Sequence, residues 1–183
     1  MRIYSEENKL YVESDYSAKF VREAKKLNGK WTGRAWRFDV RDEQLVRDVL
    51  INVYGTDGEK SVETVNVEVD VMAAPGDDSI ELFGRVLCKR FSRDSQVRLH
   101  DSVIVSKGEF HSRGGSAKYP VLTFDEGTTL LVKDVPVSLV EKEMEKYPDA
   151  IKIVSDKKVD KDALLKEKES LLKRLAEIEE LLK

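Results

Sequence analysis

Apolar and polar residues alternate along several short stretches of the chain, a pattern typical of β-strands with one buried face. The clearest stretch is residues 62–71, where valines occupy every second position from Val65 to Val71. Shorter apolar stretches between turn residues indicate further strands, and a helical period after Pro136 indicates one helix. The predicted strands are residues 80–91, 97–99, 103–106, 121–124, 129–132 and 150–154, and the predicted helix is residues 137–147.

The first 58 residues combine strand and helix patterns. Asp15 and Ser17 are both suitable caps for a helix that carries an apolar stripe, and Asn28-Gly29 is a suitable end for it. A hairpin that turns at Gly33-Arg34 follows this helix. The predicted elements are strands 2–4 and 10–13, a helix from residue 15 or 17 to 28, a hairpin over 30–40 and a helix over 42–53.

Residues 160–183 contain no glycine or proline and have the composition of a helix. Leucine and isoleucine recur there with a heptad period, so one face of the helix is apolar and needs a partner. We expect this helix to pair with a second copy in a homodimer, and packing back onto the same chain is the alternative. The residues expected to make the contact are Leu164, Leu171, Leu175, Ile178 and Leu182.

Turn-rich breaks divide the chain into three predicted parts. Residues 1–58 form a small unit of strands and helices, residues 59–155 form a β-rich unit with one covering helix, and residues 156–183 form the helical tail. Several short strands separated by turns favour a small barrel, similar to an OB-fold barrel, or a sandwich for the middle part. The predicted fold class is therefore α+β.

The distribution of charge along the chain suggests a local phosphate-binding surface. Charged residues make up 37% of the 183 residues, and the net charge is −3. Residues 85–118 hold 8 Lys and Arg against 3 Asp and Glu, whereas residues 59–84 hold 1 against 7. A basic segment of this kind is suited to phosphate groups even on an acidic protein.

Disulfide, metal and membrane chemistry find little support in the sequence. Cys88 is the only cysteine, which excludes a disulfide within the chain, and the two histidines leave few ligands for zinc. No apolar stretch reaches the ~20 residues that span a bilayer, and no signal-peptide pattern opens the chain. We therefore expect a cytoplasmic protein that needs no cofactor or metal.

Residues 26–39 hold both tryptophans, which are interleaved with cations on a predicted hairpin. Aromatic rings and cations on a small sheet suit stacking on nucleobases and neutralisation of phosphates. Alternation puts Trp36 and Phe38 on one face, which we assign to the core, and leaves Trp31 as the exposed ring. The predicted binding residues of this hairpin are Lys30, Trp31, Arg34 and Arg37.

A second basic surface is predicted around a hairpin that turns at residues 92–96 and in the loop of residues 107–120. Gly114-Gly115 in this loop allow backbone N–H groups to face an anion. Basic strands beside mobile loops are typical of barrels that bind oligonucleotides, although ordinary solvated charge explains the same pattern. The predicted binding residues are Arg85, Lys89, Arg90, Arg93, Arg98, Arg113 and Lys118.

The N-terminal part resembles a known DNA-binding domain. Residues 16–31, followed by Arg34-Ala-Trp-Arg-Phe38 and an acidic helix start, are similar to the HARP domain of annealing helicases, and the resemblance covers residues 9–54. It implies a strand, helix, hairpin and helix in that order, and binding to single-stranded or forked DNA. It does not imply the ATP-driven activity of that family, because nothing in the sequence fits the Gly-x-x-x-x-Gly-Lys-Ser/Thr motif.

These features favour a non-catalytic accessory protein, of phage or mobile-element type, that binds single-stranded or forked DNA. The alternative is a protein-binding inhibitor or adaptor, similar to anti-CRISPR proteins, in which the acidic residues 59–81 mimic phosphates and block a nucleic-acid enzyme. A third hypothesis is a Mg²⁺-dependent hydrolase that uses Asp77, Asp78, Asp125 or Glu126. The three hypotheses differ in whether nucleic acid is bound, ignored or cleaved.

Overall fold

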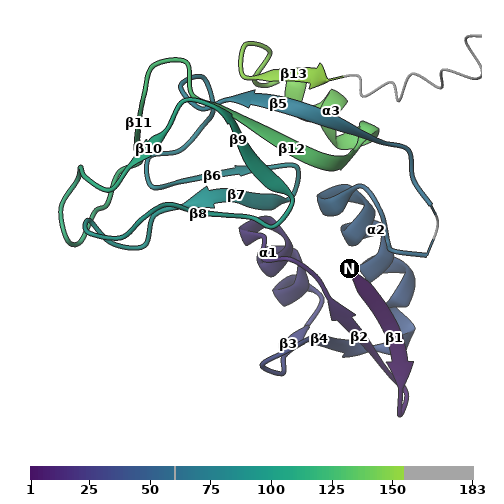
Figure 1. Cartoon of the computed structure of the whole chain (residues 1–183). Coiled ribbons are helices and arrows are strands. Elements are labelled where there is room, and N and C mark those ends of the chain that lie inside the picture. Colours follow the sequence, from purple (N-terminus) through teal and green to yellow (C-terminus); the bar gives the residue numbers. More distant parts are fainter. Residues whose placement is uncertain (60, 155–183) are drawn as a thin grey trace, which may run out of the picture.

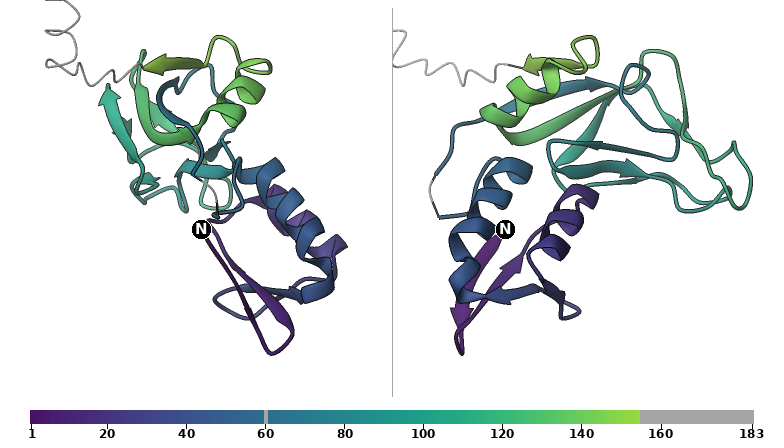
Figure 2. Two further views of the ribbon diagram at one scale, coloured as in Figure 1. Left: turned by 90° about the vertical axis from the view of Figure 1, so that its right-hand side faces the viewer. Right: turned by 180° about the vertical axis from the view of Figure 1, so that it is seen from behind.

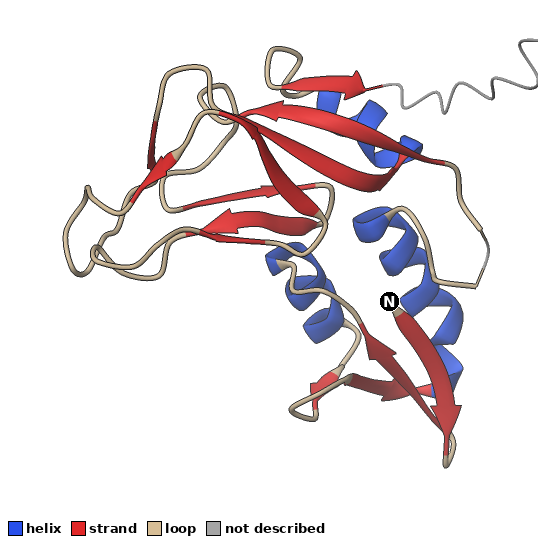
Figure 3. Ribbon diagram, in the orientation of Figure 1, coloured by secondary structure: helices blue, strands red, loops and turns tan. Residues whose placement is uncertain are grey.

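The computed structural model describes residues 1–59 and 61–154, which fold as an antiparallel α+β structure (Figures 1 and 3). The predicted α+β class is confirmed. None of the helices in the described part is long and apolar enough to cross a bilayer. The residues expected to form a dimer contact lie outside the described residues: Leu164, Leu171, Leu175, Ile178 and Leu182.

The N-terminal unit is a four-stranded antiparallel sheet with two helices packed on one face. Its strand order is β1–β2–β4–β3. Inward-facing residues of β2 and β4 pack against the helices, and Trp36 and Phe38 are buried there as predicted. The elements are β1 (Arg2–Glu6), β2 (Lys9–Glu13), α1 (Ala18–Lys26), β3 (Lys30–Trp31), β4 (Trp36–Asp39), a 3₁₀ turn (Val40–Asp42) and α2 (Glu43–Tyr54).

Helix α1 begins at a cap that involves a residue of the β-rich unit. The Ser17 side chain accepts a hydrogen bond from the Phe20 N–H at 3.4 Å, so Ser17 is the cap of the two candidates. The Ser17 hydroxyl donates to Glu81 Oε1 at 3.0 Å, and the Ala18 N–H donates to the same oxygen at 3.2 Å. A carboxylate at this position is also favoured by the helix dipole. The start of α1 is therefore stabilised by the other unit.

The β-rich unit consists of three antiparallel sheets, of which the two larger share one core. The first has the order β13–β5–β12–β9, the second is β6–β7–β8, and the third pairs β10 with β11. Helix α3 packs on the first sheet (Figure 1). The elements are β5 (Thr64–Asp70), β6 (Ser79–Leu82), β7 (Arg85–Lys89), β8 (Arg98–Leu99), β9 (Val103–Lys107), β10 (Phe110–His111), β11 (Thr123–Phe124), β12 (Thr129–Pro136), α3 (Val137–Met144) and β13 (Ile151–Val154).

A closed barrel, one of the two architectures expected for this unit, is not formed by the described residues, and that expectation is wrong. Strands β8, β10 and β11 contain two residues each. Strands this short cannot carry a continuous hydrogen-bond ladder from one sheet to the next. The sheets therefore keep separate edges. Strand β13 pairs with β5 at one of these edges, as expected for residues 150–154.

The stretch expected to be one strand, residues 80–91, is two strands joined by a tight turn. The chain reverses at Phe83 and Gly84, whose φ angles of 55° and 73° are both positive. Positive φ at both central residues is the requirement of a two-residue hairpin with a type I′ turn. The Phe83 side chain is buried in the core, and this burial offsets the unfavourable backbone conformation of a bulky residue.

Gly84 allows this turn to approach the N-terminal unit. A side chain there would place its Cβ 2.2 Å from the carbonyl oxygen of Val53 near the end of α2. A polar contact lies close by, because the Lys142 ammonium of α3 donates to Asn52 Oδ1 of α2 at 2.6 Å. Figures 1 and 2 show α1 and α2 between the N-terminal strands and the β-rich unit, so that both helices contribute to the contact between the units.

Replacing Gly84 by alanine should destabilise the protein more than replacing Gly33, which is the matched control. Both glycines have positive φ, but a Cβ at Gly33 has nothing within 4 Å, whereas one at Gly84 would clash with the Val53 carbonyl. We expect Gly33→Ala to lower the free energy of unfolding by about 1 kcal/mol and Gly84→Ala by at least about 2 kcal/mol more. Urea unfolding measures both, and equal losses would contradict a close contact between the units.

Candidate nucleic-acid interface

The face of the N-terminal sheet that the helices leave uncovered carries one row of residues across all strands. Tyr4 pairs with Tyr11, Tyr11 pairs with Arg37, and Arg37 pairs with Lys30 in the strand register. Directly opposite residues in a sheet project from the same face. Because Leu10 and the other inward-facing residues occupy the alternate positions, this row faces away from the core. We call Tyr4, Tyr11, Arg37 and Lys30 the outer row.

The aromatic half of the outer row is a preformed stack. The rings of Tyr4 and Tyr11 lie 5.3 Å apart between centroids, with an angle of 10° between their planes. The Arg2 guanidinium lies over the Tyr4 ring at 5.0 Å from its centroid. Both tyrosines are half-buried, so their packing in the sheet holds the rings in place while leaving part of each ring accessible.

The basic half of the outer row lacks carboxylate partners. On the same face Lys9 pairs with Asp39 at 3.0 Å. Hydrogen bonds from Arg41 and Lys9 hold the pKa of the Asp39 carboxyl well below its usual range. Among the ion pairs between described residues, neither Arg37 nor Lys30 takes part. Like charges directly opposite in a sheet repel, so an anion between these two side chains would be stabilising.

Trp31 lies on the other side of this sheet from Lys30 and Arg37. It pairs with Trp36 on the helix-facing side, with ring centroids 5.8 Å apart, and is 54% exposed. The two rings line a groove of about 460 Å³ together with Tyr16, which lies in the loop between β2 and α1. Alternation along β3 places Lys30 and Trp31 on opposite faces. The four residues expected to form one surface are therefore divided between two faces, and the Arg34 guanidinium pairs with Glu13 at 3.1 Å.

The β7–β8 hairpin presents an aromatic ring next to two cations. Lys89 and Arg98 are directly opposite in the register. The Lys89 ammonium lies 5.5 Å and the Arg98 guanidinium 5.2 Å from the centroid of the Phe91 ring, and the residue Phe91 is 60% exposed. We call these three residues the Phe91 patch. The sequence predicted both cations as binding residues but not Phe91. Phe91 lies two residues after Lys89 in the predicted strand 80–91, and alternation would have placed both residues on one face.

Arg90, expected at the surface, is fully buried. Its guanidinium donates to the carbonyl oxygens of Ser92 at 3.2 Å and Val121 at 2.8 Å, and also to those of Arg93 and Arg113. A buried charge requires several such partners to replace its hydration. Arg90 therefore belongs to the interior and joins the 91–97 loop to the 112–122 loop. The expectation failed because one residue of a charged run points inward.

Arg85 is also removed from the expected surface. The pairing of β6 and β7 contains a β-bulge. Lys89 lies opposite Ser79 and Arg85 lies opposite Leu82, and these two partners are three positions apart on β6. An odd spacing means that the two cations project to different faces. The Arg85 guanidinium donates to Ser102 Oγ at 2.9 Å, and burial lowers the pKa of this side chain.

The remaining cations of the expected second surface lie on exposed loops. Arg93 pairs with Asp94 at 3.2 Å. The Lys118 ammonium lies 5.3 Å from the centroid of the Tyr119 ring. Arg113 lines a pocket of about 600 Å³ that is also bordered by residues of β8, β9 and β10. All three cations lie on the two loops that Arg90 joins, and none of them belongs to the Phe91 patch.

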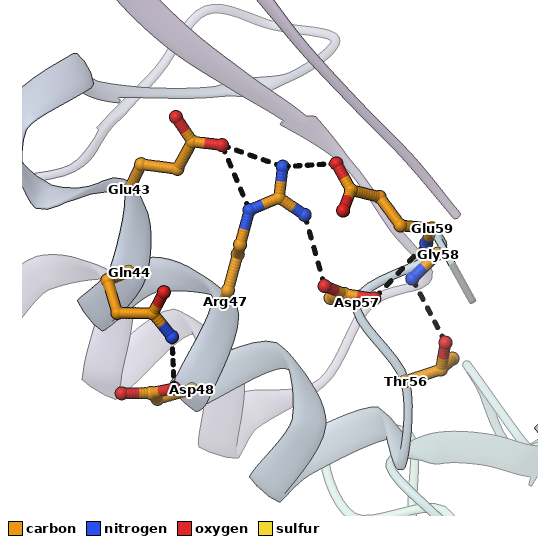
Figure 4. Close-up of polar contacts among 8 residues, drawn as sticks. All are labelled: Glu43, Gln44, Arg47, Asp48, Thr56, Asp57, Gly58 and Glu59. Carbon is orange, nitrogen blue, oxygen red and sulfur yellow. Dashed lines mark hydrogen bonds and ion pairs between the residues drawn. The ribbon is translucent and has the colours of Figure 1, made fainter.

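The acidic segment expected to mimic phosphates uses several of its carboxylates within the fold. Glu59 joins Asp57 and Glu43 around the Arg47 guanidinium, with N–O distances of 2.6, 3.0 and 2.7 Å (Figure 4). Farther along, Glu81 accepts the two hydrogen bonds at the start of α1. These carboxylates stabilise turns and a helix end, which is an ordinary structural role.

The acidic residues of the hydrolase hypothesis do not form a metal-binding cluster. In the described part of the chain no group of three or more His, Cys, Asp and Glu side chains is placed to hold a metal ion. Asp125 Oδ1 is hydrogen-bonded to His111 Nε2 at 2.9 Å, and Asp78 Oδ1 accepts a hydrogen bond from the Ser79 hydroxyl at 2.9 Å. Cys88 is buried, and burial raises the pKa of its thiol to about 12.

No protein-family model matches this chain, and comparison with curated proteins and with solved structures found no similar protein. The function is therefore inferred from the geometry of the outer row and the Phe91 patch.

Replacing Arg90 should destabilise the β-rich unit far more than replacing its neighbour Arg93. Arg90→Met removes the guanidinium donor from the carbonyl oxygens of Val121 and Arg93, at a cost of about 1–3 kcal/mol for each group left unsatisfied. We expect the free energy of unfolding to fall by at least about 3 kcal/mol, whereas the exposed control Arg93→Met should change it by less than about 0.5 kcal/mol. Urea unfolding and limited proteolysis of the two loops measure the effect, and equal stability of the variants would contradict it.

The Arg47 cluster should make stability depend on acid pH. A backbone hydrogen bond from Glu59 and the Arg47 guanidinium hold the pKa of Asp57 below its usual range. Its contribution is therefore complete above about pH 4 and is lost as pH falls through the lowered pKa. We expect the free energy of unfolding to decline less steeply between about pH 5 and pH 2 in Asp57→Asn than in the unchanged protein. Identical slopes in urea unfolding would contradict the assignment.

Proposed function

We propose that this protein binds single-stranded nucleic acid, such as the unpaired part of a DNA fork, and that it acts by binding rather than by catalysis. The observation that carries the proposal is the outer row, in which a stacked pair of tyrosines continues into two cations without carboxylate partners. Aromatic faces stack on bases of any sequence, and cations neutralise the phosphates that link them. The outer row offers both on one uncovered sheet face.

The dimensions of the outer row suit an extended strand. The row crosses the whole four-stranded sheet, and three gaps of about 4.8 Å give a length of about 14 Å. This length leaves room for more than one base beside the tyrosine rings. A phosphate between Lys30 and Arg37 would also relieve the repulsion between these opposed cations.

The same features favour single strands over duplex. Stacking on a tyrosine face requires a base whose own face is free, and base pairs inside a duplex offer none. A duplex would meet only the two cations and would bind through phosphates alone. The resemblance of residues 9–54 to the HARP domain implies the same class of ligand.

Two substitutions in the outer row should weaken binding in different ways. Tyr11→Leu removes a stacking surface but keeps an apolar side chain, and we expect about a tenfold loss of affinity for a labelled single strand. Arg37→Gln removes a phosphate contact and should lower the slope of log K against log salt by about 0.7. Fluorescence anisotropy at several salt concentrations measures both effects.

Lys26→Gln is the matched control for these variants, because Lys26 is an exposed cation of the same unit that pairs with Glu23 at 2.8 Å. It should leave affinity for single strands unchanged within about twofold. Duplex of the same length should bind more weakly and be insensitive to Tyr11→Leu. Single-strand affinity that is unaffected by both outer-row variants would overturn the proposal.

A further inference from the structure

The Phe91 patch has the chemistry of a binding site and lies on a different unit from the outer row. Its aromatic residue, Phe91, is more than half exposed, although full burial is the usual way for a phenylalanine to contribute to stability. The segment that contains it, residues 85–118, has an excess of Lys and Arg, with 8 against 3 acidic residues. The combination of an exposed ring and excess positive charge points to an anionic ligand with an aromatic or planar group.

The charges of the Phe91 patch are not compensated by the fold. Lys89 and Arg98 are directly opposite in the register, where like charges repel. Among the ion pairs between described residues neither takes part, and the ion pair within the hairpin loop joins Arg93 to Asp94. Both cations instead approach the Phe91 ring. Such an arrangement costs free energy in the unbound protein and is relieved when a phosphate group lies between the two side chains.

The Phe91 patch is also held in place before any ligand binds. The residue next to the ring is Arg90, which is buried and whose backbone N–H donates to the Asp78 carbonyl at 2.8 Å. The Arg90 guanidinium fixes the carbonyls of the loop that follows the ring, including that of Ser92 at 3.2 Å. A fixed backbone on either side of the ring lowers the entropy lost when a ligand binds. This rigidity distinguishes the patch from a flexible loop with solvated charges.

We propose that the Phe91 patch is a second binding site for single-stranded nucleic acid, in which a base stacks on Phe91 and its phosphates contact Lys89 and Arg98. The proposal takes the class of ligand from the proposed function but rests on separate residues. One protein molecule then holds two separate segments of a strand, one on the outer row and one on the patch. A long strand that reaches both sites binds more tightly than a short one, because the second contact forms within the complex.

The number of short strands bound per protein tests this inference directly. A probe of about six thymidines is of the size that one small site accommodates. Calorimetric titration of the full chain should give two such probes per protein. The patch variant Lys89→Gln with Phe91→Ser, both changes on the exposed side of the hairpin, should bind one. The outer-row variant Tyr11→Leu with Arg37→Gln should also bind one, and the combination of all four changes should bind none.

A long strand provides the second readout. An oligothymidine of about forty nucleotides should bind the unchanged protein about a hundredfold more tightly than the short probe does. Either paired variant should lose most of this gain while still binding the short probe. The control Lys133→Gln, an exposed lysine on β12, should change neither the number of probes nor the gain. Thermal unfolding of every variant establishes that the proteins compared are folded.

The outcomes distinguish failure of the Phe91 patch, failure of the outer row and failure of both sites. One probe per unchanged protein, lost in the outer-row variant and kept in the patch variant, would overturn the second site and leave the proposed function standing. If the Phe91 patch binds a protein partner instead of nucleic acid, the titration gives this same result of one probe per protein. One probe lost only in the patch variant would instead contradict the outer row. Binding that survives all four changes would contradict both sites.

Discussion

A single buried charge organises the exposed loops of the β-rich unit. The Arg90 guanidinium has backbone carbonyl oxygens as its partners, so its charge is stabilised by dipoles that belong to two different loops. Its backbone N–H adds a third segment through the Asp78 carbonyl. Strands β8, β10 and β11, which border the two loops, are two residues long and form only short ladders. The Arg90 side chain therefore fixes the backbone that follows Phe91.

Strand alternation decides how the candidate surfaces are divided. A hairpin of two short strands has two faces, and neighbouring residues in the chain are sent to opposite ones. The tryptophans of the N-terminal sheet consequently lie on the face that packs against the helices. Lys30 and Arg37 lie on the opposite face, in one row with the tyrosines of β1 and β2. A cluster that is dense in the sequence is thus separated in space, and an aromatic pair from a distant segment takes its place. The sheet therefore has an apolar groove on one side and a polar row on the other.

The sequence predicted those features that depend on local patterns. Ser17 as one of two candidate caps, the core positions of Trp36 and Phe38, and the edge strand over 150–154 all follow from spacing and turn chemistry. The turn at Phe83 did not, because a buried aromatic residue with positive φ is stabilised by contacts far away in the chain. The direction of Arg90 depends in the same way on carbonyls up to 31 residues distant.

The candidate site shows the same limit. Lys30, Arg37, Lys89 and Arg98 were recognised from composition, whereas the rings that accompany them were not. Tyr4 and Tyr11 pair across a hairpin whose register cannot be read from so short a pattern, and Phe91 follows a charge that points inward. In each case the missing information was which face of a strand a residue occupies, and that is set by pairing with another strand.

The carboxylate of Glu81 at the start of α1 has a consequence for how the chain divides. A helix of nine residues is short for independent stability, and its start donates two hydrogen bonds to the Glu81 carboxylate, more than 60 residues later in the chain. A fragment ending at the boundary near residue 58 would keep its sheet and its small core but lose that anchor. The N-terminal unit therefore depends on the β-rich unit for part of its stability. Produced alone, it is expected to fray at the start of α1, where Glu81 now accepts the two hydrogen bonds.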